Sequence, residues 1–408
     1  MRRKNNRADR IRRALAAVCL CAVLGAGCGY FHITPRDDVG SAGLCHSAVI
    51  IGMVEGDRDT AVMVTAWPES PAARNVEYVV LDRPGSFQLY LPKGTYRLFA
   101  LCDANADGVF DSSESCGTGD SPVSLVEGDV KPDVSIRISG RPALPGSFHV
   151  KEDASFPRQV GNGSIAKIYD ERFSHHNANI GWWSPSIFMK AFGARIYFTR
   201  QYHGETLPVL FVHGAQGSPQ DWAYFHFKMD TRRYQPWYYY YPSGMRLPLA
   251  SSILYENILD LRRRYPFSSI CITAHSMGGL VARNMLAKHD LRKIGIDKVV
   301  FITLASPWSG FRSADRAKNM PSKKIPVWLD VGASSDFIAQ TLRAKLPGNV
   351  RYYLFFGKED SVAAERALDW RACEGSLGTY GFEADHDMIL RDRTVYNRYS
   401  EIVRKELP

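Results

Sequence analysis

The pattern of hydrophobic and polar positions changes near residue 205 of the 408-residue chain. Beyond that point short apolar runs alternate with longer amphipathic stretches, and residues 249–264 and 277–289 are the clearest predicted helices. The apolar runs predict strands at residues 209–212, 237–240, 270–274, 299–304, 327–331 and 352–356. Strands that alternate with helices form a mostly parallel sheet covered on both faces, so residues 191–408 are predicted to form one α/β domain.

The first half of the chain reads as short strands instead. Turn residues such as Pro84-Gly85 separate predicted strands at residues 47–53, 61–66, 76–81, 86–91, 95–101 and 134–138. Residues 45–140 therefore predict a small all-β sandwich, similar to the prealbumin-like modules that are often attached to secreted enzymes. A stretch rich in Pro and Gly follows, and residues 141–190 are interpreted as a linker and cover segment.

The amino terminus has the pattern of an export signal. Seven basic residues precede an apolar run at residues 14–27, which is too short to span a bilayer because spanning takes about 20 residues. The run ends in Gly27-Cys28 and resembles the lipobox of bacterial lipoproteins, although Gly25 stands where that pattern usually has Leu. The resemblance implies a signal peptide at residues 1–27, a lipid on Cys28 and a tether at residues 28–44, and hence a membrane-anchored protein in the periplasm or outer membrane. Plain secretory cleavage is the alternative.

Charge and cysteine content narrow the function classes. The formal net charge of +9 falls to +3 without residues 1–27, so no basic surface argues for nucleic acid. None of the eight cysteines has a Cys-x-x-Cys metal spacing. An odd thiol is expected in the exported chain, with Cys271, inside an apolar run, as the inert candidate.

The central chemical motif is Ala274-His275-Ser276-Met277-Gly278-Gly279. It lies where an apolar run ends and a helix begins, which is the strand-turn-helix setting of a nucleophile elbow. The turn needs small residues two places before and after the Ser, and Ala274 and Gly278 are small. A capped helix start is the alternative reading of the pentapeptide alone.

A Gly-rich segment about 60 residues upstream strengthens the nucleophile reading. The run 209–212 leads directly into His213-Gly214-Ala215, where main-chain N–H groups are suited to an oxyanion hole. The predicted donors are the amides of Ala215 and Met277. His213 and His275 are interpreted as packing residues.

The hexapeptide around Ser276 resembles the elbow of small secreted bacterial lipases. The segment Thr303-Leu304-Ala305-Ser306-Pro307 resembles the next strand of lipases and of hydrolases related to GPI inositol-deacylase. The resemblance covers about residues 190–408. It implies the α/β-hydrolase fold, with acyl esters or lipids as substrates and no cofactor for catalysis.

In this fold the acid and the His follow the Ser, so the base must lie downstream. His289 would sit about 20 Å from Ser276 along the same helix, which leaves His386. Asp360 directly follows a predicted strand and is the preferred acid, with Asp330 and Asp336 as rivals. The predicted catalytic set is thus Ser276, Asp360 and His386.

A second candidate site lies in the β-rich region. Oxygen-bearing residues occur at the spacing of a calcium loop around Gly108, namely Asp103, Asn105, Asp107, Asp111 and Glu114. A solvated turn rich in Asp and Asn is the alternative. Cys102 and Cys116 flank the loop and are candidates for a disulfide that would stabilise it by about 3 kcal/mol.

These features predict a lipid-anchored serine hydrolase that forms an acyl-enzyme on Ser276. Esters, thioesters and amides all stay open as substrates. Two other functions are also open: a catalytically idle binding or surface lipoprotein, and an acyltransferase that uses the same three residues.

Overall fold

The computed structural model describes residues 47–57, 59–70, 76–153, 156–317, 325–363 and 374–408. The predicted signal peptide, the lipidation of Cys28 and the tether lie outside these residues. Among the residues that are described, no helix combines the length and apolarity needed to cross a membrane.

The amino-terminal region is one curled β-sheet. Its eight strands are β1 (Ser47–Glu55), β2 (Val62–Pro68), β3 (Glu77–Leu81), β4 (Ser86–Pro92), β5 (Gly94–Cys102), β7 (Ser115–Gly119), β8 (Val123–Leu125) and β9 (Val130–Ile138). They follow the order β3-β2-β5-β7-β9-β1-β4, with β8 paired to β5, and the two edge strands β3 and β4 also contact each other. Because the hydrogen-bonded path is continuous around one core, a sandwich of two separate sheets is not confirmed.

A separate two-stranded sheet accompanies the curled one. It pairs β6 (Val109–Asp111) with β10 (His149–Lys151) in antiparallel register. Neither strand is apolar and long enough to be recognised from its residues, so both are absent from the predicted elements. The pairing connects the predicted calcium loop to the segment that follows the curled sheet.

Two buried glutamines join the curled sheet to the next part of the chain. The Gln88 side chain donates to the Ala194 carbonyl oxygen at 3.0 Å and accepts from the Ala194 amide at 2.7 Å. Gln159 donates to the carbonyl oxygens of Gln88 and Met189. Each glutamine amide thus satisfies main-chain groups that would otherwise be buried without partners.

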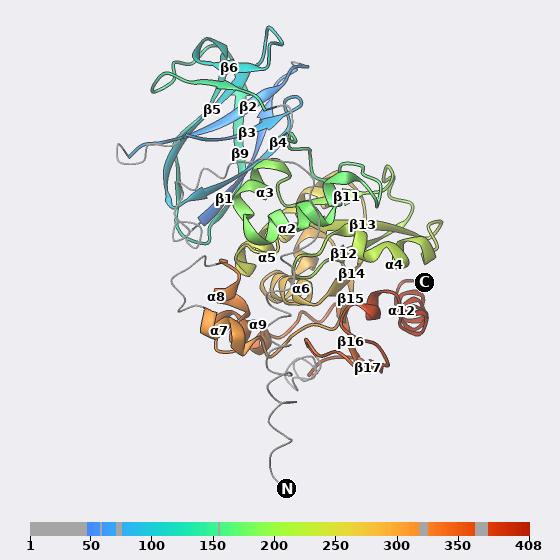
Figure 1. The fold of residues 1–408 in the computed structure, drawn as a ribbon. Helices are drawn as coiled ribbons and strands as arrows, with labels where there is room; N and C mark the ends of the chain where they lie inside the picture. The colour runs from blue at the N-terminus through green and yellow to red at the C-terminus, as the bar shows by residue number, and fades with distance from the viewer. Residues whose placement is uncertain (1–46, 58, 71–75, 154–155, 318–324, 364–373) are drawn as a thin grey trace. The chain divides into compact units, whose positions relative to one another are not determined.

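The carboxy-terminal half is a seven-stranded sheet with helices on both faces. Its strands are β11 (Arg195–Phe198), β12 (Leu207–Val212), β13 (Tyr234–Tyr240), β14 (Ser269–His275), β15 (Lys298–Leu304), β16 (Val350–Gly357) and β17 (Thr379–Phe382). They are arranged in the order β11-β13-β12-β14-β15-β16-β17, and only the β11–β13 pair is antiparallel (Figure 1). The carboxyl ends of the parallel strands therefore share one edge.

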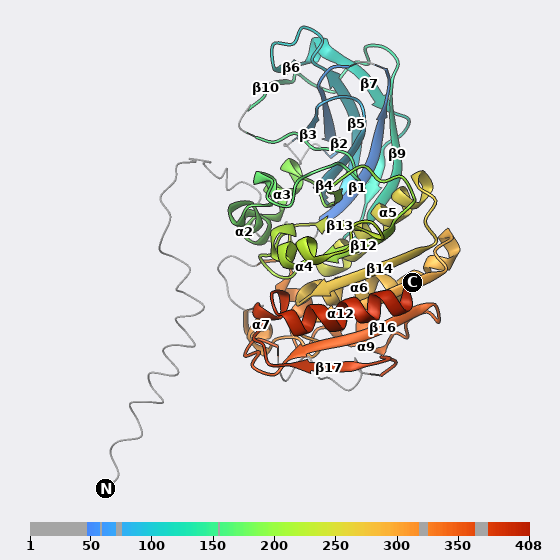
Figure 2. The ribbon, with the colours of Figure 1, turned by 90° about the vertical axis from the view of Figure 1, so that its right-hand side faces the viewer.

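Alternate residues of the central strand β12 belong to different parts of the core. Leu210 and Val212 share one hydrophobic cluster with the apolar sides of α5 (Leu247–Arg264), α6 (Met277–Lys288) and α9 (Asp336–Arg343). Val209 and Phe211 pack instead toward α4 (Ala223–Lys228) and α12 (Arg393–Glu406), and Figure 2 shows α12 lying across that face. This alternation is the period-two pattern of a strand that is buried on both sides.

One predicted strand is wrong. Within residues 327–331, Trp328–Val331 forms a short helix, α8, rather than a strand. The sheet has no vacancy there, because β15 pairs directly with β16. The buried carboxylate of Asp330 also accepts hydrogen bonds from the Arg246 guanidinium and the Leu247 amide, which fixes this turn against the start of α5.

Candidate active site

Ser276 occupies a sharp turn between β14 and α6. Its backbone has φ of 50°, an uncommon conformation for a residue with a side chain, and such strain is concentrated at functional sites. A Cβ atom on Gly278 or on Gly279 would collide with the His213 carbonyl oxygen or with the Ser306 hydroxyl. The two glycines are therefore needed for the close approach of neighbouring segments, and the turn presents Ser276 at the carboxyl edge of the sheet.

His386 reaches Ser276 from a loop far along the chain. Its Nε2 lies 2.9 Å from Ser276 Oγ and its Nδ1 lies 2.8 Å from Asp360 Oδ2. Both distances fall in the range expected for a nucleophile, a base and an orienting carboxylate. The structure thus brings together the three residues that were predicted to form the catalytic set.

Asp360 is held as an anion by its surroundings. Only 1% of the residue is exposed, and its second oxygen accepts hydrogen bonds from the amides of Val362 and Ala363. Burial by itself raises the pKa of Asp360, but the hydrogen bonds from His386 and from these amides outweigh it and leave the pKa below its ordinary value. A charged Asp360 fixes the Nδ1–H tautomer of His386, which leaves Nε2 free to accept the Ser276 proton.

The rival residues lie in other settings. Asp330 is paired with Arg246, and Asp336 begins α9. His289 stacks on Tyr255 with ring centroids 3.7 Å apart, just past the far end of α6. None of these three residues contacts His386 or Ser276 in the described structure.

The loop after β12 packs against the Ser276 turn. A Cβ atom on Gly214 would lie 2.8 Å from Ser276 Cβ, so the loop main chain passes directly beside the nucleophile. Gln216, with φ of 55°, donates its amide to Ser243 Oγ at 2.9 Å and holds the turn. Within the described residues neither the Ala215 nor the Met277 amide has a protein acceptor, which leaves both free to bind an oxyanion.

Two further histidines are buried in this region. His213 donates from Nδ1 to the Gly214 carbonyl oxygen, and burial lowers its pKa to about 4. His275 donates from Nε2 to the carbonyl oxygen of His386 at 2.8 Å, and burial lowers its pKa to about 3. The prediction of packing roles misses this second contact, because no sequence spacing signals a bond between residues 111 positions apart.

Part of this region matches a known protein family. Residues 248–341, which include nearly all of α5, the Ser276 turn and β15, match the family described as "Putative serine esterase (DUF676)". No curated protein is similar enough in sequence to match the chain. The matched family is described as a serine esterase, and Ser276 lies within the matched residues.

Solved structures of similar proteins cover about half of the chain. Est1E from Butyrivibrio proteoclasticus is 12% identical, with 53% of this chain and 96% of that chain covered and a TM-score of 0.39. The Paleococcus ferrophilus monoacylglycerol lipase is 12% identical, with 49% and 94% covered and a TM-score of 0.38. Mouse alpha/beta hydrolase domain-containing protein 10 is 12% identical, with 52% and 99% covered and a TM-score of 0.35.

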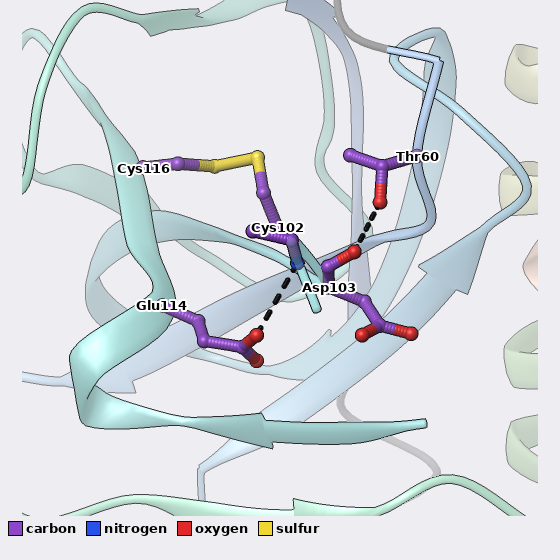
Figure 3. The surroundings of a disulfide bond; sticks show 6 residues. Thr60, Cys102, Asp103, Glu114 and Cys116 are labelled. Atoms are coloured by element: carbon purple, nitrogen blue, oxygen red, sulfur yellow. Dashed lines mark hydrogen bonds between the residues drawn. A yellow bond between two sulfur atoms is a disulfide. The ribbon is translucent and has the colours of Figure 1, made fainter. Parts of the chain in front are cut away.

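The predicted calcium loop joins β5 to β7 and is closed by a disulfide between Cys102 and Cys116 (Figure 3). Cys271 is the one free cysteine in the described part of the chain, and burial raises its pKa to about 12, as suits an inert thiol. The disulfide ties the end of β5 to β7 across the loop.

The carboxylates of this loop bind its own main chain. The two Asp103 oxygens accept from the amides of Asp107 and Gly108, Asp111 accepts from Ser113, and Glu114 Oε1 accepts from Ala104. Asn105 donates to Asp107. Among the described residues no group of three or more His, Cys, Asp or Glu side chains is placed to hold a metal ion. Calcium binding here stays a prediction.

Proposed function

We propose that this chain is an exported, lipid-anchored serine esterase that cleaves carboxylic esters through an acyl-enzyme on Ser276. The observation that carries the proposal is the unbroken chain of hydrogen bonds from Ser276 through His386 to the buried Asp360. The strained turn at Ser276 and the free amides beside it supply the other elements that acyl transfer needs.

The acylation step follows from this geometry. Ser276 Oγ attacks the ester carbonyl carbon while His386 Nε2 accepts the hydroxyl proton, and the Asp360 carboxylate stabilises the resulting imidazolium. The carbonyl oxygen gains negative charge and is bound by the amide N–H groups of Ala215 and Met277. The tetrahedral intermediate then collapses, and the alcohol leaves with the proton that His386 returns to it.

Water then hydrolyses the acyl-enzyme by the same steps in the opposite order. His386 Nε2 accepts a proton from a water molecule, whose oxygen attacks the acyl carbon of the acyl-enzyme. A second tetrahedral intermediate forms and expels Ser276 Oγ, which takes back the proton from His386. The products are a carboxylic acid and the free enzyme.

Two other functions compete with ester hydrolysis. An acyltransferase would use the same residues but would pass the acyl group to an alcohol or amine other than water. A binding lipoprotein would use the β-rich region and leave Ser276 unused. The hydrogen-bonded Ser276–His386–Asp360 arrangement favours the two catalytic readings over the binding one.

The decisive experiment combines a covalent probe with substrates. A fluorophosphonate should label the wild-type protein and leave Ser276→Ala unlabelled, and nitrophenyl esters of increasing acyl length should be hydrolysed by the wild type alone. Product analysis with added alcohols separates hydrolysis from acyl transfer. An unlabelled wild-type protein that turns over none of these esters would refute the esterase proposal.

The anchor has its own test. Cys28→Ala should release the protein from the membrane fraction and remove the mass of the lipid. Unchanged fractionation and mass in the Cys28→Ala variant would contradict the lipidation while leaving the esterase proposal intact.

A further inference from the structure

His275 makes a specific contact with the loop that carries the base. Its ring is buried between the Ser276 turn and His386, and its Nε2 lies 2.8 Å from the main-chain oxygen of His386. A carbonyl oxygen can only accept a hydrogen bond, so His275 Nε2 carries the proton. The Trp222 ring meets the His275 ring edge-on and confines it from another side.

The contact gives the Ser276 turn a second hydrogen bond to His386. One bond joins the Ser276 hydroxyl to the His386 ring and must form again during every turnover. The other is the bond from the His275 ring to the His386 main chain, which takes no part in proton transfer. A main chain held in place leaves the His386 side chain with few ways to move away from Ser276.

The same loop is tied to the acid by different bonds. The Glu359 amide donates to the Ala384 carbonyl oxygen at 3.2 Å, and the Lys358 amide donates to the Phe382 carbonyl oxygen at 2.8 Å. These bonds connect the segment before His386 to the turn that carries Asp360. The loop is therefore fixed toward the acid by its own main chain and toward the nucleophile by the His275 side chain.

We propose that His275 is a positioning residue whose ring N–H holds the His386 main chain, so that the His386 imidazole stays in line between Asp360 and Ser276. The inference rests on the proposed esterase function. Burial keeps the His275 ring neutral over the working pH range, so the donor and its tautomer do not change when His386 gains or loses a proton.

Three substitutions distinguish hydrogen-bond donation by the His275 ring from the packing of that ring. His275→Gln can place an amide N–H near the position of Nε2, His275→Asn has an amide that is too short to reach His386, and His275→Phe fills the space without a donor. Displacement of a reacting group by about 1 Å costs on the order of 100-fold in rate. We expect kcat to fall about 10- to 100-fold in the Phe and Asn variants with KM nearly unchanged, and the Gln variant to regain most of the loss.

The fluorophosphonate labelling rate should follow kcat in the same order. His289→Gln is the matched control, because His289 stacks on Tyr255 outside the site, and it should keep wild-type kcat. Melting temperatures of all variants show whether they are folded. If the Phe variant does not fold, the Gln and Asn variants still decide the question.

The outcomes are distinct. Recovery of kcat in the Gln variant but not in the Asn variant supports the inference. Equal kcat in the Gln and Asn variants, whether high or low, overturns it, because the donor would then not matter. A wild-type protein without esterase activity refutes the proposed function instead, and that result is read from the wild type before any His275 variant is compared.

Discussion

The turn at Ser276 and the loop between Cys102 and Cys116 each carry a motif that residue spacing alone singles out, yet their side chains have different partners. At Ser276 the contacts come from distant parts of the chain, since His386 lies 110 residues away and Asp360 lies 26 residues before His386. In the loop, Asp103 and Asp111 bind amides only two to five residues away. Ser276 and Asp360 thus meet at the two ring nitrogens of one distant side chain, as a reactive site needs, whereas local partners stabilise a turn.

The largest expected effect is on kcat, and it distinguishes Asp360 from Asp336 as the acid that orients His386. Asp360→Asn should lower kcat about 10⁴-fold, because the Asn amide no longer fixes the His386 tautomer or stabilises the imidazolium. Ser276→Ala and His386→Ala should each lose at least as much, and their effects should not add to that of Asp360→Asn because the three residues act as one unit.

Asp336→Asn serves as the control for the acid, because Asp336 begins α9 and does not contact His386. Initial rates with a nitrophenyl ester measure all four variants. Loss of activity in Asp336→Asn together with an active Asp360→Asn would reverse the assignment of the acid.

Local patterns predict part of the arrangement around Ser276. Small residues mark the turn at Ser276, and the position of Asp360 after β16 favours it as the acid. The choice of His386 also needs the chain order that the resemblance implies. Hydrogen bonds join the three side chains in the structure, and their catalytic roles stay a prediction. Residues 327–331 were assigned wrongly, because a short apolar run fits a strand or a buried helical turn equally well until its neighbours are known. The bond from His275 to His386 depends on loop placement, which no local pattern encodes.

Acid should weaken the region around Ser276 more than the curled sheet. The folded-state pKa is about 3 for His275 and about 4 for His213, below the ordinary value of 6.5, so the unfolded chain binds protons that the folded chain does not bind between these values. The contribution of the two neutral histidines to the free energy of unfolding is therefore fully present above pH 6.5 and is lost as the pH falls toward 4. Asp360, with a lowered pKa, acts in the same direction, whereas Asp221, whose pKa burial raises, opposes it.

We expect the free energy of unfolding to fall by about 2–5 kcal/mol between pH 6.5 and pH 4.5. Denaturant unfolding at a series of pH values measures the change. Tryptophan fluorescence, to which Trp222 beside His275 contributes, should change early as the region around Ser276 loses stability. Stability that is flat over this interval would contradict the buried neutral state of the two histidines.

Removal of the disulfide should change the other region and spare the site. The Cys102→Ala, Cys116→Ala double variant frees a loop of 14 residues' separation and should lose about 3 kcal/mol of unfolding free energy. The kcat of the variant should match the wild type at a temperature where both are folded. A loss of kcat in the folded variant would show that the curled sheet and the Ser276 site are coupled.

The smallest expected effect concerns calcium at the same loop. Glu114 Oε2 is buried and has no hydrogen-bond partner among the described residues, and burial followed by repulsion from Asp103 and Asp111 raises the Glu114 pKa. A bound cation would relieve both costs, so calcium at 10 to 100 times its dissociation constant should stabilise the β-rich region by about 1–3 kcal/mol. The melting temperature with calcium and with a chelator measures the shift, and Asp107→Asn should reduce it because it removes one charged oxygen ligand from the loop.

Magnesium serves as the control ion, since it prefers shorter bonds and rigid octahedral geometry. A melting temperature that changes with neither calcium nor chelator would contradict calcium binding. The carboxylates would then only accept hydrogen bonds from the main chain of their own turn, unlike the side chains at Ser276, whose partners are distant in sequence.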